Sequence, residues 1–134
     1  MKPLNLLMAL IGLSIKPVSA RCFWGGVKWE SRAAARHYAV IACKIGDGSY
    51  RDAFEGQYAP GIAVHKCYQH SPTQKIEFMI RNVNLSLYKG LDGDACVRCL
   101  HHEINGCSRG GSSDLAGWTF RADPNKGTCK EARL

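Results

Sequence analysis

The sequence has no apolar run long enough to cross a membrane. Its longest apolar stretch, Leu6 to Ile15, is too short to span a bilayer, and no second one follows. Lys2 precedes this stretch, and the small residues Val18-Ser19-Ala20 follow it, which is the pattern of a secretory signal peptide. We therefore predict cleavage after Ala20 and secretion of residues 21–134 to the extracellular space.

Internal repeats, low-complexity tracts and linkers are absent as well. The predicted mature chain of 114 residues therefore reads as one small domain. Loss of Lys2 and Lys16 with the leader lowers the formal net charge from +7 to +5. A moderately basic charge suits an anionic cell wall, a membrane surface or nucleic acid, but it selects none of them.

Cysteine, in contrast, is abundant, and all of it lies in the predicted mature part. In an oxidising compartment these residues are disulfide candidates before they are metal ligands or redox groups. A domain of this size buries only roughly 60–70% of its unfolded surface. Disulfides worth about 2–4 kcal/mol each would therefore supply a large share of its folding stability. The seven cysteines are Cys22, Cys43, Cys67, Cys96, Cys99, Cys107 and Cys129.

Two helices are predicted from start signals and apolar spacing. Ser31 is a suitable N-cap for a helix that runs to about Lys44. Its expected apolar face consists of residues spaced by three and four, and Gly46-Asp47-Gly48 ends it. The second helix begins near Asp92 or Asp94 and ends at Gly106. The expected buried faces are Ala34, Tyr38, Ile41 and Ile45 in the first helix, and Cys96, Cys99 or Leu100, and Ile104 in the second.

The clearest strand is Lys75 to Val83, where Ile76, Phe78 and Ile80 alternate with Glu77, Met79 and Arg81. With the strand expected at Gly61 to Tyr68 and the turn Ser71-Pro72-Thr73, it suggests a hairpin. We also expect strands at Phe23–Trp29 and Trp118–Arg121, a short helix and a loop within 49–61, a loop at 108–117, and a turn at Asp123-Pro124-Asn125-Lys126-Gly127.

The resulting order is β-α-β-β-α-β. It predicts an α+β fold: a disulfide-stabilised two-layer sandwich with two helices on one face of an antiparallel sheet and the other face partly solvated. This is the split β-α-β arrangement.

No catalytic motif stands out. A small, basic, secreted chain suggests a ribonuclease-type hydrolase as an alternative, which needs a base, an acid and a cation for the phosphate. No ribonuclease family motif is present, and Gly110-Gly111-Ser112-Ser113 beside Arg109 lacks the context of a phosphate-binding loop. We predict a protein that is not an enzyme, has no catalytic residues and needs no cofactor. The candidates for the hydrolase alternative are His37, His65, His101, His102, Glu77 and Arg81.

The segment Cys96-Val97-Arg98-Cys99-Leu100-His101-His102 raises two further alternatives, a zinc site that includes Cys107 and a Cys-x-x-Cys redox site. In a secreted chain disulfide chemistry is favoured over both, so we predict no metal site. Asn84-Leu85-Ser86 is an N-glycosylation sequon at Asn84. The tryptophans Trp24, Trp29 and Trp118 suit either sugar stacking or a small aromatic core, and the core is favoured.

The C-terminal third carries a resemblance. A helix ending in Gly106-Cys107 and the pair Gly110-Gly111 precede the closing segment Gly117-Trp118-Thr119-Phe120-Arg121-Ala122-Asp123-Pro124-Asn125-Lys126-Gly127-Thr128-Cys129. Over roughly residues 33–129 this resembles a group of small secreted cysteine-rich proteins of filamentous fungi, which includes candidate plant-pathogen effectors. It is also loosely similar to the killer toxins of smut fungi.

The resemblance implies a secreted, non-catalytic, effector-like or toxin-like fungal protein that acts outside the producing cell in host interaction or virulence. Its partner would be a host protein or a cell-surface target. We expect a monomer that does not bind nucleic acid. The alternatives are the ribonuclease-type hydrolase and an antifungal toxin that acts at a membrane or channel.

Seven cysteines leave one sulfur over in a monomer. We predict that Cys99 is the free thiol, because the resembled group usually has glycine there and because it shares a helical stripe with Leu100 and Ile104. Cys107 ends the second helix, and Cys129 follows the strand at Trp118, which we expect to return beside that helix. We therefore predict the pair Cys107–Cys129, with Cys43–Cys67 and Cys22–Cys96 as companions.

Overall fold

The computed structural model describes residues 21–48 and 51–130. The predicted signal peptide, residues 1–20, lies outside the described residues. The elements follow the order β1 (Arg21–Cys22), α2 (Arg32–Val40), a π-helical segment (Ile41–Ile45), β2 (Gly56–Tyr58), β3 (Ala63–Ser71), β4 (Gln74–Asn82), β5 (Lys89–Leu91), α3 (Gly93–Gly106), β6 (Gly111–Leu115) and β7 (Trp118–Lys126).

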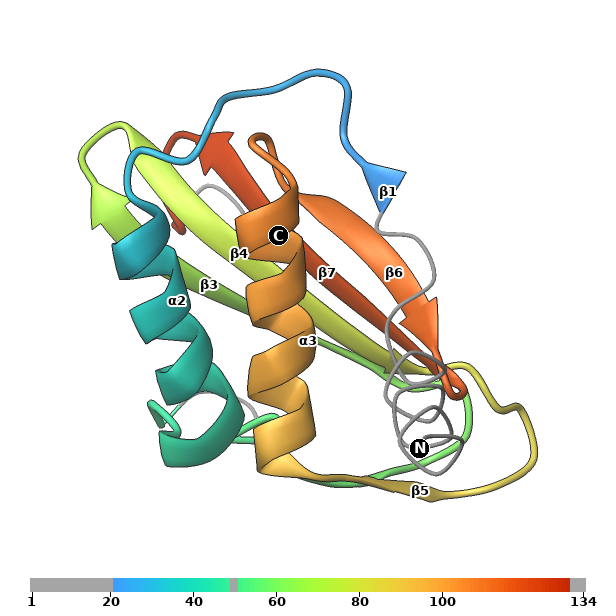
Figure 1. Ribbon diagram of the computed structural model, residues 1–134. Coiled ribbons are helices and arrows are strands. Elements are labelled where there is room, and N and C mark those ends of the chain that lie inside the picture. Colours follow the sequence, from blue (N-terminus) through green and yellow to red (C-terminus); the bar gives the residue numbers. More distant parts are fainter. Residues whose placement is uncertain (1–20, 49–50, 131–134) are drawn as a thin grey trace, which may run out of the picture.

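The predicted α+β two-layer fold is confirmed. Five strands form an antiparallel sheet in the order β1-β6-β7-β4-β3, and α2 and α3 both lie on one face of it (Figure 1). The strands β2 and β5 form a separate two-stranded sheet. Because β7 lies between β4 and β6, the unit β4-α3-β6 is a split β-α-β arrangement.

Both helices begin where the sequence predicts. The Ser31 hydroxyl accepts a hydrogen bond from the Ala34 amide at 3.0 Å, and Asp92 caps α3 through the Ala95 amide at 2.9 Å. The π-helical segment ends at Gly46, whose φ of 89° is a left-handed conformation that favours glycine. The first helix therefore stops at the predicted glycine.

The buried face of the first helix differs from the prediction. Instead of Ala34, Tyr38, Ile41 and Ile45, the fully buried positions are Ala35, Ala39, Ala42 and Cys43. Cys43 is bonded to Cys96 of α3, so the residues four and eight positions before it, Ala39 and Ala35, face the same way. Ile45 is left 67% exposed. In α3 the predicted stripe is buried, including Cys96, Leu100 and Ile104.

The β3–β4 hairpin is confirmed, with Val64 opposite Ile80 and Tyr68 opposite Ile76. As predicted, Ile76, Phe78 and Ile80 are buried. They pair with Pro124, Ala122 and Phe120 of β7, so the core lies between the centre of the sheet and the two helices.

Four predicted segments are corrected. Residues 23–29 form a loop after the two-residue strand β1, because Gly26 takes a φ of 88° that no strand continues through. The described part of 49–61 contains no helix and includes β2. The expected loop at 108–117 contains β6.

The fourth correction is the expected turn at 123–127. Asp123, Pro124, Asn125 and Lys126 continue β7 and pair with β4. Pro124 has no amide hydrogen to give, but β6 stops pairing with β7 at Ala122, so this side of the strand is an edge. A proline therefore fits within the strand.

The three disulfides also correct the predicted pairing. The structure bonds Cys22 to Cys107, Cys43 to Cys96 and Cys67 to Cys129, and it leaves Cys99 as a buried free thiol. The six bonded cysteines are those we expected, but each has a different partner. Alternation along β3 explains part of this, because Val64 and Lys66 face the helices while Cys67 faces away and cannot reach Cys43.

The positions of β7 and β1 explain why the predicted pairs Cys107–Cys129 and Cys22–Cys96 do not form. Strand β7 continues past its expected end at Arg121 and carries Cys129 to the β3 side of the sheet, away from Cys107. Strand β1 pairs with β6 at Gly111, next to the C-terminal end of α3, where Cys107 lies. Cys96 is eleven residues earlier, about 16 Å along the helix, which is too far from Cys22.

Candidate functional site on the helix-free face of the sheet

The face of the sheet that no helix covers is polar. Along β3, β4 and β7 the side chains that alternate with the core residues point to this side. We call this surface the open face. Its members are His65, Cys67, Gln69, Lys75, Glu77, Met79, Arg81, Thr119, Arg121, Asp123 and Asn125.

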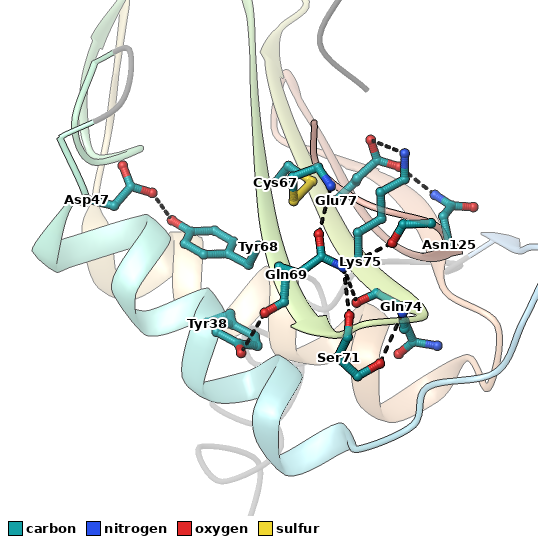
Figure 2. Close-up of a disulfide and its surroundings, with 12 residues drawn as sticks. Tyr38, Asp47, Cys67, Tyr68, Gln69, Ser71, Gln74, Lys75, Glu77 and Asn125 are labelled. Carbon is teal, nitrogen blue, oxygen red and sulfur yellow. Dashed lines mark hydrogen bonds and ion pairs between the residues drawn. A yellow bond between two sulfur atoms is a disulfide. The ribbon is translucent and has the colours of Figure 1, made fainter. Parts of the chain in front are cut away.

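Glu77 lies at the centre of the open face. Its Oε1 accepts a hydrogen bond from Asn125 Nδ2 at 2.7 Å, and its Oε2 lies 3.9 Å from Lys75 Nζ (Figure 2). Asp123 is directly opposite Glu77 on β7. A carboxylate, an amide and an ammonium group therefore converge from two adjacent strands, half-buried and with their polar atoms turned outward.

Arg121 extends this group along β7. Its guanidinium pairs with Asp123 Oδ2 at 2.9 Å and lies over the Phe23 ring, 5.1 Å from the ring centroid. The aromatic contact connects the open face to the loop that follows β1. Both interactions favour this position of the guanidinium.

Two hollows lie on this surface, and Glu77 lines both. The larger one, about 600 Å³, is lined by Gly26, Val27, Lys75, Glu77, Asn125 and Lys126. The smaller one, about 130 Å³, is lined by His65, Glu77, Phe78, Met79, Arg121 and Asp123. The larger hollow is bounded partly by the loop after β1, so it is a pocket between the sheet and that loop.

A disulfide stabilises one margin of the open face. Cys67 on β3 is bonded to Cys129, and the Gln69 side chain accepts a hydrogen bond from the Cys129 amide at 2.8 Å. The same side chain donates to the carbonyl oxygens of Ser71 and Gly127 at 2.7 and 3.0 Å (Figure 2). These contacts hold the segment after β7 against β3.

The candidates for the hydrolase alternative are only partly brought together. Glu77 and Arg81 share one face of β4, as predicted, and His65 lines the small hollow with Glu77. His37, His101 and His102 do not join them, because α2 and α3, which carry these histidines, lie on the other side of the sheet (Figure 1). Among those histidines, His101 Nε2 lies 3.1 Å from the Arg36 carbonyl oxygen, which is a contact between the helices.

The zinc and redox alternatives are excluded at the expected residues. Cys96 and Cys107 are both in disulfides, so neither offers a thiolate to zinc or a partner to Cys99. The part of the chain that the structure describes contains no group of three metal-binding side chains. Burial raises the pKa of the remaining Cys99 thiol, which makes it a poor nucleophile.

Two of the three tryptophans belong to the core, and the third is exposed where it could stack on a sugar. Trp29 and Trp118 are 9% and 7% exposed and belong to the core, as predicted. Trp24 is 97% exposed and follows Phe23 in the loop beside the open face. Gly111, Ser112 and Ser113 belong to β6, and Arg109 Nε donates to the Gly26 carbonyl oxygen at 3.2 Å.

Asn84 lies in the loop between β4 and β5. Its Oδ1 accepts hydrogen bonds from the Ser86 and Leu87 amides at 2.8 and 2.7 Å. The side chain is partly exposed, and its neighbours Leu85, Leu87 and Tyr88 are exposed as well. Glycosylation at Asn84 stays a prediction.

A comparison with protein families identifies the chain. The model of the family described as glycan binding domain Y3 matches residues 51–129, more than half of the sequence. The chain belongs to this family. Neither a comparison with curated proteins nor one with solved structures gives a match.

The family assignment fits a non-catalytic extracellular binding protein. The three disulfides fit an extracellular location as well. No helix among the described residues is long and apolar enough to cross a membrane. The matched range includes the whole β3–β4 hairpin, α3 and β7, and therefore every member of the open face.

Sequence reasoning missed most of this surface. It singled out Glu77, Arg81 and His65, but it assigned Asp123 and Asn125 to a turn. The available signal was the alternation of Thr119, Arg121, Asp123 and Asn125 with Phe120, Ala122 and Pro124, which is a period of two. Pro124 lies within this alternating segment and favoured a turn, so the strand was not recognised.

Proposed function

We propose that this protein binds glycans outside the cell that secretes it, and that the open face is its binding surface. The observation that carries the proposal is the convergence of Lys75, Glu77 and Asn125 in one pocket, within the residues matched by a glycan-binding family. The glycan would belong to a cell surface or wall, which agrees with the moderately basic charge of the chain.

The chemistry of the pocket suits a sugar. Neighbouring hydroxyl groups need both donors and acceptors, and the pocket supplies an ammonium donor, a carboxylate acceptor and an amide that does both. Glu77 and Asn125 are already hydrogen-bonded to each other at 2.7 Å, so their positions are set before a ligand arrives. Little conformational freedom would be lost on binding.

Binding without catalysis is the interpretation that the same geometry supports. Glu77 is paired with Lys75, and Asp123 is paired with Arg121, so both carboxylates are in ion pairs. Among the described residues, the carboxyl group whose pKa burial raises is that of Glu103, which lies in the core on the helix side of the sheet. A general acid for glycosidic cleavage would have to act from the open face instead.

A glycan array tests the proposal. The secreted, disulfide-bonded protein is applied to immobilised oligosaccharides of hexoses and N-acetylhexosamines, beside the variants Asn125→Ala and Glu77→Gln. Each variant should weaken binding about 10-fold or more, because each removes hydrogen-bonding groups from the pocket. Ile45→Ala is the control, since Ile45 is 67% exposed at the end of the segment Ile41–Ile45 and does not belong to the open face.

We place this binding in host interaction, as the resemblance to secreted fungal effector-like proteins implies. In that setting the protein would be a monomeric virulence factor that recognises glycans of the host surface. Expression in plant tissue with a cell-death or defence readout tests this role. Loss of the readout in Asn125→Ala would connect the role to glycan binding.

A second candidate is the ribonuclease-type hydrolase, which one observation favours. His65, Glu77 and Arg121 line one small hollow, and they supply a base, an acid and a cation. An RNA-cleavage assay on the same preparation decides it. Cleavage that His65→Ala lowers about 100-fold or more, with folding unchanged, would promote this candidate over glycan binding.

A further inference from the structure

The loop between β1 and α2 presents an exposed tryptophan beside the pocket. Trp24 is 97% exposed, whereas the other two tryptophans are buried in the core. Tryptophan is enriched among the residues that dominate binding interfaces. Trp24 lies outside the residues 51–129 that the family model matches, so the family assignment does not account for it.

The loop is anchored on both sides of Trp24. Before it, Cys22 is bonded to Cys107 and the Phe23 amide donates to the Gly110 carbonyl oxygen at 2.8 Å. After it, the Gly26 carbonyl oxygen accepts a hydrogen bond from Arg109 Nε at 3.2 Å. The backbone that carries Trp24 is therefore fixed within two residues in each direction.

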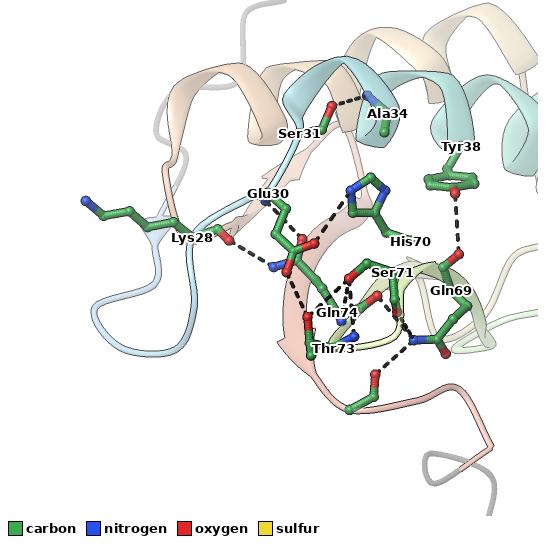
Figure 3. A network of polar contacts seen from close by, with 11 residues as sticks. Lys28, Glu30, Ser31, Ala34, Tyr38, Gln69, His70, Ser71, Thr73 and Gln74 are labelled. Carbon is green, nitrogen blue, oxygen red and sulfur yellow. Dashed lines mark hydrogen bonds and ion pairs between the residues drawn. The ribbon is translucent and has the colours of Figure 1, made fainter.

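The far end of the loop is held by the β3–β4 turn (Figure 3). Gln74, which is 2% exposed, donates to the Lys28 carbonyl oxygen at 2.9 Å and accepts from the Glu30 amide at 3.1 Å. The Glu30 carboxylate also accepts a hydrogen bond from Thr73 at 3.2 Å and lies 3.7 Å from His70 Nε2. A loop held in this way presents its aromatic ring without paying an ordering cost on binding.

The loop also forms part of the pocket. Gly26 and Val27 line it together with Lys75, Glu77 and Asn125. Consecutive Cα atoms are 3.8 Å apart, so the Cα of Trp24 is within about 7.6 Å of that of Gly26. The residue before Trp24, Phe23, contacts Arg121 of the open face. Trp24 is therefore flanked by residues that touch the open face on both sides.

We infer that Trp24 is a stacking site for a pyranose ring of the glycan bound in the pocket. The flat indole covers the apolar C–H face of the ring, while Lys75, Glu77 and Asn125 bind hydroxyl groups of the same or the neighbouring sugar. This inference rests on the proposed function and names the sugar surface that the loop recognises. The ligand class is an oligosaccharide with at least one hexopyranose whose C–H face is accessible.

Binding measurements on matched variants test the inference. The oligosaccharide of hexose or N-acetylhexosamine residues that the wild type binds best on the array is titrated into four variants. Trp24→Ala should bind about 30-fold more weakly or worse, as expected for a central aromatic anchor, and Trp24→Phe should retain most of the affinity. Tyr88→Ala, which removes another exposed aromatic residue, should bind like the wild type. Asn125→Ala reports on the pocket itself.

Tryptophan fluorescence gives an independent readout. Iodide should quench Trp24 strongly, because the other two tryptophans are buried. Saturating oligosaccharide should protect the wild type from iodide and leave the weak quenching of Trp24→Phe unchanged. Because Trp24 makes no core contact, its variants should melt at the wild-type temperature.

The outcomes separate the inference from the proposed function. If Asn125→Ala loses binding and Trp24→Ala binds like the wild type, the stacking site is refuted and glycan binding stands. If the wild type binds no oligosaccharide on the array, both are refuted. Loss of affinity in Trp24→Ala with protection from iodide in the wild type establishes the stacking site.

Discussion

Asn125 on β7 donates a hydrogen bond to Glu77 on β4 across 2.7 Å. The contact crosses the centre of the sheet on its open face. It joins β4 and β7, the two strands that supply the polar side chains of the proposed glycan pocket. It also depends on Pro124, because the strand must continue through the proline for Asn125 to lie opposite Lys75. An acceptor on one strand is thereby fixed by a donor on the next.

The first prediction concerns this hydrogen bond. Asn125→Ala should leave folding intact and cost about 0.5–1.5 kcal/mol of stability, because Glu77 keeps access to water and to Lys75. Chemical denaturation measures the change. Asn125→Asp should be worse than Asn125→Ala, since it sets two carboxylates against each other across the strands.

The second prediction concerns Cys99. Cys99→Ala should cost only about 1 kcal/mol for the small cavity, whereas Cys96→Ala or Cys107→Ala should cost about 2–5 kcal/mol because each breaks a bridge. Native protein should react slowly with an alkylating agent, since burial raises the pKa of Cys99.

Peptide mapping checks the assignment. Alkylation of the unfolded, unreduced protein should label Cys99 alone. Label on Cys22, or a disulfide-linked dimer without label, would contradict it.

The third prediction concerns the buried carboxyl group of Glu103. Its Oε2 accepts a hydrogen bond from Ser113, its Oε1 receives none from the described residues, and burial raises its pKa. A carboxyl whose pKa is higher in the folded state stabilises the fold below its unfolded pKa of about 4.3. That contribution is lost as the pH rises through the folded-state pKa.

Glu103→Gln is the matched variant, because its amide oxygen can still accept from Ser113 and carries no charge. The free energy of unfolding of the wild type should fall relative to that of Glu103→Gln as the pH rises above about 4.3. Denaturant titrations at several pH values measure the difference. A difference that is independent of pH would show that Glu103 does not titrate in this way.

The fourth prediction concerns processing. For the signal peptide, N-terminal sequencing of the secreted protein should begin at Arg21. For the glycan, a glycosidase that removes N-glycans should lower the mass of the wild type but not that of Asn84→Gln. A glycan at Asn84 would cover the neighbouring Leu85 and Leu87, which are 78% and 61% exposed. Asn84→Gln should therefore aggregate more readily. Retention in the cell or an intact Met1 would contradict the signal peptide.

Much of the fold could be predicted because local patterns were strong. The alternation in β4 and the caps at Ser31 and Asp92 fixed three elements within one or two residues. The rotation of α2 could not be predicted from its larger apolar residues, since the Cys43–Cys96 bond turns a face of alanines inward. Disulfide partners are contacts between distant segments, and no local pattern encodes them.

The candidate site was harder to predict than the fold, because it depends on the register between paired strands. Lys75 meets Asn125, and Glu77 meets Asp123, only once β4 and β7 are paired in one particular alignment. The pocket also needs Gly26 and Val27, which the chain brings from 48 residues before Lys75 or more. The sequence favoured a buried role for all three tryptophans, but Trp24 is 97% exposed in the loop after β1.

The central claim is that a glycan binds on the open face. The most direct test is an amide chemical-shift titration of the labelled protein with the oligosaccharide that binds best on the array. We predict shifts that saturate together at Lys75, Glu77, Asp123 and Asn125, with the amides of α3 unchanged. Shifts confined to the loop 83–88 or to the helices, or no shifts at all, would contradict the claim.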